Sequence, residues 1–146
     1  MEFTGEYIHT LDPKGRLIIP TRFREQLGSE FYVTRGLDGC LFVYPEDEWK
    51  TFSAKLRSLP LIDEGARKLT RFFAAGATPC ELDKQGRILV PATLREFACL
   101  EKDVVLAGMV NRIEIWSKDR WISNNTFDNE DIQNVAAHLT SIGFVL

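Results

Sequence analysis

The spacing of hydrophobic positions predicts short strands on both sides of a helical middle segment. Eight strands are expected, each a run of four to six residues rich in apolar and β-branched side chains, at 6–11, 16–19, 31–35, 40–44, 77–82, 87–90, 103–107 and 112–116. Short helices are expected to begin at Pro20 and Pro91, because a proline at the first helical position forfeits no hydrogen bond. Gly28 should cap the end of the first of these helices.

The middle segment, 45–76, is predicted to form two amphipathic helices. The first carries apolar side chains at three- and four-residue steps, at Trp49, Phe52, Leu56 and Leu59. Pro60 should end this helix, and Asp63 should cap the second. The apolar face of the second helix comprises Ala66, Leu69, Phe72 and Phe73.

The tail beyond Trp121 shows a third amphipathic pattern, at Ile132, Val135, Ala136, Leu139 and Ile142. We expect this stripe to pack against another surface rather than to anchor the chain in a membrane, because no Lys or Arg flanks it. No Gly/Ser-rich linker divides the chain. The segments before and after the middle helices are therefore expected to share one core, filled by most of the aromatic residues.

An internal repeat is the strongest feature of the sequence. Residues 11–25 align with 82–96, with seven identities in fifteen pairs, and each copy contains the pattern Asp-x-x-Gly-Arg. The pattern predicts a tight turn, from Asp12 to Gly15 in the first copy and from Asp83 to Gly86 in the second. A second hairpin is expected to follow in each half. Two copies of one small unit indicate a protein that binds repetitively.

The charge distribution adds a second clue. The formal net charge is −3, which by itself argues against a nucleic-acid partner. Residues 12–24, however, balance at +3 and residues 83–95 at +2, whereas the tail from 124 onward balances at −3. Positive charge is thus concentrated in the repeated unit, which can bind an anion despite the acidic total.

Other classes of function find little support. No convergent catalytic set is visible, with His9 on a predicted strand and His138 in the tail, so we do not expect an enzyme or a small-molecule substrate. The three widely spaced cysteines indicate reduced thiols in a cytoplasm, and we expect no metal and no cofactor. No apolar run approaches membrane-spanning length, and the N-terminal segment does not have the pattern of a secretory signal, so no membrane association is expected.

These residues carry a resemblance to the MraZ family of bacterial transcriptional regulators. It rests on the string from Gly5 to Pro20, the second Asp-x-x-Gly-Arg motif and the segment from Tyr44 to Trp49. The resemblance implies an α+β fold in which two SpoVT-AbrB-type repeats form a tandem swapped-hairpin (double-split β-α-β, AbrB-like) pseudo-dimer, with helices between and after them. The implied parts are repeat 1 over 5–50, connecting helices over 51–76, repeat 2 over 77–122 and a C-terminal helical tail over 123–146.

The resemblance also implies a function. Members are DNA-binding regulators at the nucleoid, usually repressors of the promoter of the division and cell-wall gene cluster that includes their own gene. They assemble into homo-oligomeric rings and bind repeated boxes of double-stranded DNA. The expected DNA-binding residues here are Arg16, Arg87, Lys14, Lys84, Arg22 and Arg24, and the expected turn-shaping residues are Asp12, Gly15, Asp83 and Gly86.

Two departures and two alternatives qualify this expectation. The second copy has Gln85 in place of Lys14 and Thr93 in place of Arg22, so we expect it to bind anions more weakly. The Asp and Arg of each motif could instead form only a structural ion pair across the turn. The repeats could also serve an oligomeric assembly or protein-binding module without DNA readout.

Overall fold

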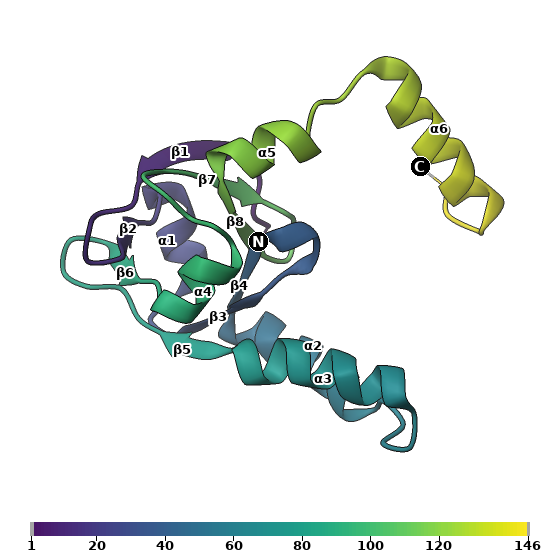
Figure 1. The fold of residues 1–146 in the computed structure, drawn as a ribbon, viewed down its shortest axis with the longest axis horizontal. Helices are drawn as coiled ribbons and strands as arrows, with labels where there is room; N and C mark the ends of the chain where they lie inside the picture. Colours follow the sequence, from purple (N-terminus) through teal and green to yellow (C-terminus); the bar gives the residue numbers. More distant parts are fainter. Residues whose placement is uncertain (1, 146) are drawn as a thin grey trace.

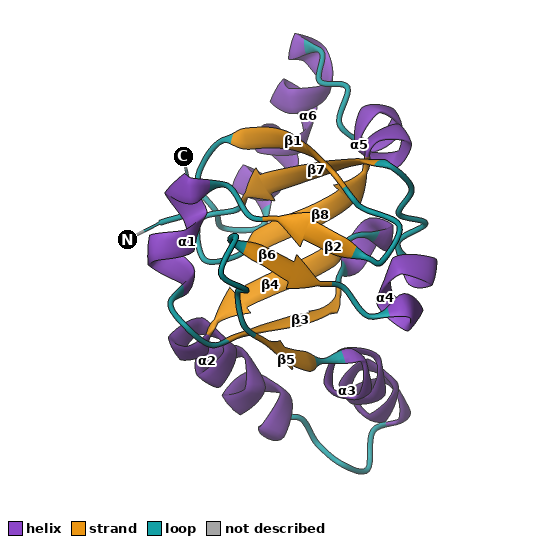
Figure 2. Ribbon diagram, turned by 90° about the vertical axis from the view of Figure 1, so that its left-hand side faces the viewer, coloured by secondary structure: helices purple, strands orange, loops and turns teal. Residues whose placement is uncertain are grey.

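The computed structural model describes residues 2–145, and the strands in this range form two antiparallel sheets (Figure 2). The larger sheet has six strands in the order β1 (Glu6–Thr10), β7 (Asp103–Gly108), β8 (Ile113–Ser117), β4 (Leu41–Pro45), β3 (Phe31–Arg35) and β5 (Thr78–Cys80). The smaller sheet is a ribbon of two strands, β2 (Arg16–Ile18) and β6 (Arg87–Leu89). Most predicted strands lie within a residue or two of these positions, but β5 is shorter than expected because only three of its residues pair with β3.

The two halves of the chain exchange strands. The first strand of the first half, β1, pairs with β7 of the second half, and β5 of the second half pairs with β3 of the first. The segments on either side of the first turn are joined by the isolated Leu11–Leu17 bridge and not by a ladder, and β2 pairs with its counterpart β6 instead. The fold is therefore α+β, a tandem swapped-hairpin pseudo-dimer within one chain, as predicted.

The helices follow the sequence pattern closely. They are α1 (Thr21–Leu27), α2 (Glu46–Arg57), α3 (Glu64–Gly76), α4 (Ala92–Phe97), α5 (Lys118–Asn124) and α6 (Asn129–Ser141), with a 3₁₀ turn at Leu37–Gly39. Asp63 caps α3 by accepting the N–H of Ala66 at 2.8 Å, as predicted. Gly28 caps α1 with a positive φ of 73°. Helix α5, which the pattern did not predict, begins after Ser117, whose hydroxyl accepts the N–H of Arg120.

The positions of the two helix-starting prolines differ from the prediction by one residue. Pro20 and Pro91 are the N-caps of α1 and α4 rather than their first residues. Their extended ψ angles, 137° and 146°, keep them outside the helix, while the carbonyl of Pro20 already accepts the N–H of Phe23. A proline suits this position too, because its missing N–H has no partner at a helix start.

Both halves contribute to one core, as expected. Phe23, Phe31 and Val43 of the first half are fully buried together with Ile88 and Leu106 of the second. A second apolar cluster lies between the six-stranded sheet and the middle helices, where aromatic side chains stack. Its buried members are Cys40, Phe42, Tyr44, Phe73, Val105 and Trp116, and the residues packed against them are Trp49, Phe52, Leu56, Phe72 and Trp121.

Helix α6 stands apart from the two sheets (Figure 1). Its apolar side chains Ile132, Val135 and Leu139 are all exposed. The tail therefore does not pack on the two sheets of its own chain, because the linker after α5 leads α6 away from them. The surface against which its apolar stripe packs stays a prediction. Among residues 2–145, no helix is long and apolar enough to cross a membrane.

Candidate nucleic-acid interface

The first repeat motif forms a turn held by a single carboxylate. Oδ1 of Asp12 accepts the backbone N–H groups of Lys14 (3.0 Å) and Arg16 (2.8 Å), while its Oδ2 accepts Nε of Arg16 at 2.6 Å. The N–H of Gly15 donates to the carbonyl of Asp12, and Gly15 has a positive φ of 84°. The backbone N–H of Arg16 is the main reason why the pKa of Asp12 lies below its ordinary value.

The second motif repeats this geometry. Oδ1 of Asp83 accepts the N–H groups of Gln85 and Arg87, both at 2.9 Å, and its Oδ2 accepts Nε of Arg87 at 2.8 Å. Gly86 has a positive φ of 75°. The pKa of Asp83 is likewise lowered, chiefly by the backbone N–H of Arg87.

The ion-pair alternative is thus realised in part, because both motif arginines contact their aspartates. Each contact uses only Nε, however, and the Nη atoms of Arg16 and Arg87 make no hydrogen bond within residues 2–145. The aspartate holds the guanidinium by one edge, and the other edge is available to a ligand. A planar guanidinium presented in this way can donate two parallel hydrogen bonds to a phosphate or to the O6/N7 edge of guanine.

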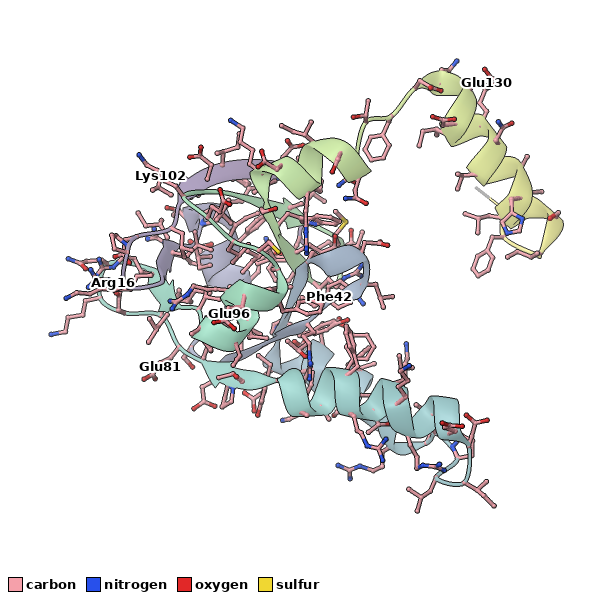
Figure 3. All side chains as sticks on the ribbon, viewed as in Figure 1. Arg16, Phe42, Glu81, Glu96, Lys102 and Glu130 are labelled. Carbon is pink, nitrogen blue, oxygen red and sulfur yellow. The ribbon has the colours of Figure 1, made fainter. Side chains whose placement is uncertain are left out.

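The ribbon places the two arginines on one surface. Arg16 lies opposite Leu89, and Arg87 lies opposite Ile18. Directly opposed residues of an antiparallel pair share a face, and faces alternate along a strand. The central pair, Leu17 and Ile88, is buried in the core, so the four flanking side chains face outward. Arg16 lies at the end of the molecule formed by β2, β6 and their turns (Figures 1 and 3).

Each turn is supported by the other half of the chain. Nη1 of Arg95, on α4, donates to the carbonyls of Lys14 (3.3 Å) and Val90 (3.1 Å) and lies over Gly15. In the reciprocal position on α1, Nε of Arg24 donates to the carbonyl of Ile19 at 2.7 Å, and its guanidinium lies over Gly86. Both glycines are consequently buried, although they belong to turns.

This arrangement distinguishes the predicted basic residues. Lys14, Lys84 and Arg22 are exposed, the first two on the turns and the third in the first turn of α1. Arg24 is half-buried and bonded to the backbone. The sequence reasoning missed the supporting role of Arg95, and the signal that could have found it is its equivalence to Arg24 in the repeat alignment.

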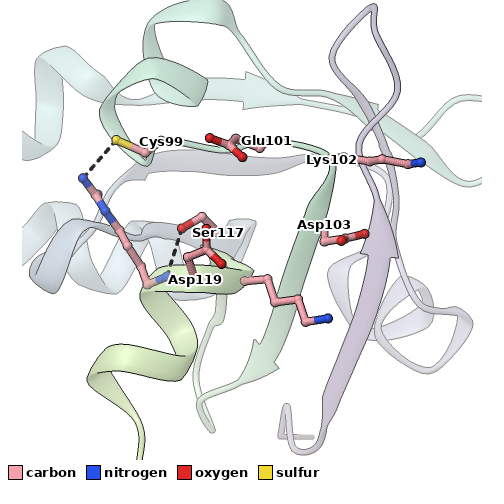
Figure 4. Close-up of a pocket in the computed structure, with 8 residues that line it drawn as sticks. Cys99, Glu101, Lys102, Asp103, Ser117 and Asp119 are labelled. Carbon is pink, nitrogen blue, oxygen red and sulfur yellow. Dashed lines mark hydrogen bonds between the residues drawn. The ribbon is translucent and has the colours of Figure 1, made fainter.

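None of the motif residues lines the pocket beside α5 (Figure 4). Acidic and basic side chains line this pocket together with a thiol and a hydroxyl. The lining residues are Cys99, Glu101, Lys102, Asp103, Ser117, Lys118, Asp119 and Arg120. Arg120 donates to the carbonyls of Gly39 (2.8 Å) and Phe97 (3.2 Å) and contacts Sγ of Cys99 at 3.0 Å. The guanidinium thus links α5 to the turn at Gly39 and to the end of α4, which is a structural role.

The thiols and potential metal ligands form no reactive cluster in the described part of the chain. Burial raises the pKa of the Cys80 thiol to about 11, and it also raises the pKa of Cys40. Within residues 2–145, no group of three His, Cys, Asp or Glu side chains is placed to hold a metal ion.

The fold and its two equivalent turns define a tandem swapped-hairpin protein of the SpoVT-AbrB type. Both halves match a single family model, described as "MraZ protein, putative antitoxin-like", over residues 2–72 and 73–139. The chain therefore belongs to the MraZ family.

Curated relatives agree with this assignment. A protein of Desulfitobacterium hafniense is 55% identical over 97% of this chain and 99% of its own length. Relatives from a Thermoanaerobacter species and from Heliobacterium modesticaldum are each 56% identical over 94% of this chain and 96% of their own length. All three bear the name "Transcriptional regulator MraZ".

Proposed function

We propose that this protein is a DNA-binding transcriptional regulator whose β2–β6 ribbon and adjoining turns contact double-stranded DNA. The observation that carries the proposal is the pair of motif arginines, Arg16 and Arg87, which lie on one outward face and whose Nη atoms make no hydrogen bond to residues 2–145. A two-stranded ribbon fits the major groove of B-DNA, and arginine is the side chain best suited to guanine edges and phosphates. The name of the relatives supports the same class of function.

In this proposal the basic residues make different kinds of contact with DNA. Arg16 and Arg87 face the groove, and the exposed Lys14, Lys84 and Arg22 add contacts to phosphates. Arg24, with its Nε on the carbonyl of Ile19, contributes through its remaining guanidinium edge. Asp12, Gly15, Asp83 and Gly86 shape the turns.

The resemblance extends the proposal to the level of the cell. The protein acts at the nucleoid in the cytoplasm, as a repressor of the division and cell-wall gene cluster and of its own gene, and needs no cofactor. Homo-oligomeric rings bind tandem boxes of DNA. Each chain consists of repeats over 5–50 and 77–122, connecting helices over 51–76 and a tail over 123–146. One subunit offers few basic contacts, so binding several boxes at once raises avidity by roughly a hundredfold or more.

The test is a gel-shift with the DNA upstream of the protein's own gene, compared with scrambled DNA of equal length. We expect Arg16→Ala to weaken binding on the order of tenfold to a hundredfold, and Arg87→Ala to weaken it less, because the second half carries fewer positive charges. Arg57→Ala, on the exposed end of α2, removes the same charge far from the ribbon and serves as the control. Equal binding by both motif variants and the parent would show that the motif is structural.

A second candidate is an assembly or protein-binding module that does not read DNA. The exposed apolar face of α6 favours it, because such faces commonly mark interfaces. Charge reversal separates the two functions. Arg16→Glu should abolish DNA binding and leave the oligomer intact if the protein is a regulator, whereas an assembly module whose repeated hairpins serve only oligomerisation would lose its oligomer.

A further inference from the structure

The outer face of the β2–β6 ribbon carries two aliphatic side chains that the core does not use. Ile18 is 38% exposed and Leu89 is 61% exposed. Their neighbours along the chain are buried. Leu17 and Ile19 flank Ile18, and Ile88 and Val90 flank Leu89. Single exposed aliphatic residues are common on protein surfaces. These two, however, are equivalent positions of the repeat and lie on one small surface.

The register joins each aliphatic side chain to a motif arginine. Leu89 is the direct partner of Arg16, and Ile18 is the direct partner of Arg87. Opposed residues of an antiparallel pair have Cβ atoms about 4.5–5.5 Å apart. That spacing is comparable with the roughly 3.4 Å between successive bases of a DNA strand. An arginine that reaches one base edge therefore places an apolar side chain near a neighbouring base pair.

We propose that Ile18 and Leu89 determine specificity by contacting thymine C5-methyl groups in the major groove. This inference rests on the proposed DNA-binding function. Among the base edges in that groove, only thymine presents an apolar group; the others present hydrogen-bond donors and acceptors. An aliphatic side chain gains contact with a methyl group, but it desolvates a polar edge without replacing its hydrogen bonds. Each pair across the ribbon thus joins an arginine of one half to an aliphatic side chain of the other.

The experiment deletes the methyl groups from the DNA rather than from the protein. The duplex upstream of the protein's own gene is amplified once with thymine and once with uracil in its place, which removes only the C5-methyl groups. Dissociation constants are measured for the parent, for the Ile18→Ala/Leu89→Ala double variant and for Ile62→Ala. Ile62 is a matched control, because it is 92% exposed and lies in the connection between α2 and α3, away from the ribbon.

The parent should bind the uracil duplex about fourfold more weakly for each methyl group contacted. The double variant should bind both duplexes with one affinity, and Ile62→Ala should show the parent's ratio. The salt dependence of the double variant should equal that of the parent, because no charge has been removed. These results together would support the inference, and the parent's own ratio tests it even if the double variant folds poorly.

Three outcomes would overturn the inference, and they are distinguishable. If the parent binds neither duplex, the proposed function fails and the inference with it. If the parent binds both duplexes equally, DNA binding stands and thymine recognition is wrong. If the double variant changes the oligomeric mass in light scattering, the outer face of the ribbon is a contact between subunits instead.

Discussion

At the residue scale, one aspartate in each motif both builds the turn and orients the arginine. Oδ1 of Asp12 binds two backbone N–H groups and its Oδ2 holds Arg16, and Asp83 does the same for Arg87. Because the carboxylate form makes these contacts, the pKa of each aspartate lies below its ordinary value of 3.8. The turn and the arginine therefore depend on the same ionised group.

This dependence predicts how stability changes with pH. A lowered pKa in the folded state means that the carboxylate stabilises the fold above the ordinary value of 3.8, and that this contribution disappears as the pH falls through the folded-state value. An Asp12→Asn/Asp83→Asn variant keeps a side-chain oxygen acceptor in each turn but lacks the charge. Its melting temperature should be below that of the parent at pH 7, and the difference should close below about pH 4. A difference of equal size at pH 3 and pH 7 would contradict the assignment.

Gly15 illustrates a second constraint at this scale. A side chain there would adopt a positive φ and would also displace the Arg95 guanidinium. We expect Gly15→Val to lower the free energy of unfolding by about 2–3 kcal/mol and to weaken DNA binding. Gly28→Val provides the control, since Gly28 has positive φ but open space around it, and it should cost only about 1–2 kcal/mol. Thermal melts would measure both, and a normally melting Gly15→Val protein would show that the turn tolerates a side chain.

At the element scale, the two short helices each support the turn of the opposite half. Arg24 on α1 lies over Gly86, and Arg95 on α4 lies over Gly15. Reciprocal backbone bonds, from Ile19 to Gly86 and from Val90 to Gly15, accompany these contacts. Each half thus stabilises the other's turn, which couples the two motif turns structurally.

Arg22 and Arg24 provide a matched test of this support, two residues apart on α1. Arg24→Ala should lower the free energy of unfolding by about 1–2 kcal/mol, because a charged donor to the Ile19 carbonyl is removed. Arg22→Ala should leave the melting temperature unchanged and weaken DNA binding, because Arg22 is exposed. Denaturant titrations and gel-shifts on both variants would check this, and equal melting of the two would refute the supporting role of Arg24.

At the scale of the whole molecule, many of the apolar residues outside the core lie in the projecting tail. The stripe of Ile132, Val135 and Leu139 is exposed on α6. Burying such surfaces against further copies of the chain stabilises an oligomer, and heterologous contacts close into a ring when the rotation allows.

We therefore predict a homo-oligomeric ring, with the β2–β6 ribbons on a common face. Light scattering at micromolar concentration should give a mass several times that of the 16.7 kDa chain. A chain ending at Asn125 should give a lower mass with a similar melting temperature, because α6 takes no part in either apolar cluster. For this shortened chain, the slope of log K for DNA binding against log salt concentration should be shallower by about 0.9 for each DNA phosphate that the smaller assembly no longer neutralises. A single-chain mass for the full-length protein would contradict both the ring and the avidity argument.

Features that depend on local interactions could be predicted from the sequence. The Asp-x-x-Gly turns, the cap at Asp63 and the amphipathic faces of α2 and α3 arise from residues within four positions of one another, so periodicity and turn chemistry predict them. The repeat also placed Arg16 and Arg87 at equivalent positions after the turns. The assignment of these arginines to DNA remains a prediction, as do the boundaries of the repeats.

Which surfaces meet was determined by tertiary packing. That β1 pairs with β7 and β2 with β6 depends on burying both halves in one core, and strand periodicity is the same whichever partner is chosen. The support of Gly15 by Arg95 joins residues eighty positions apart, which no local pattern encodes. The exposure of Leu89 has the same origin, because an apolar side chain in a strand faces the core or the solvent according to the register of its partner.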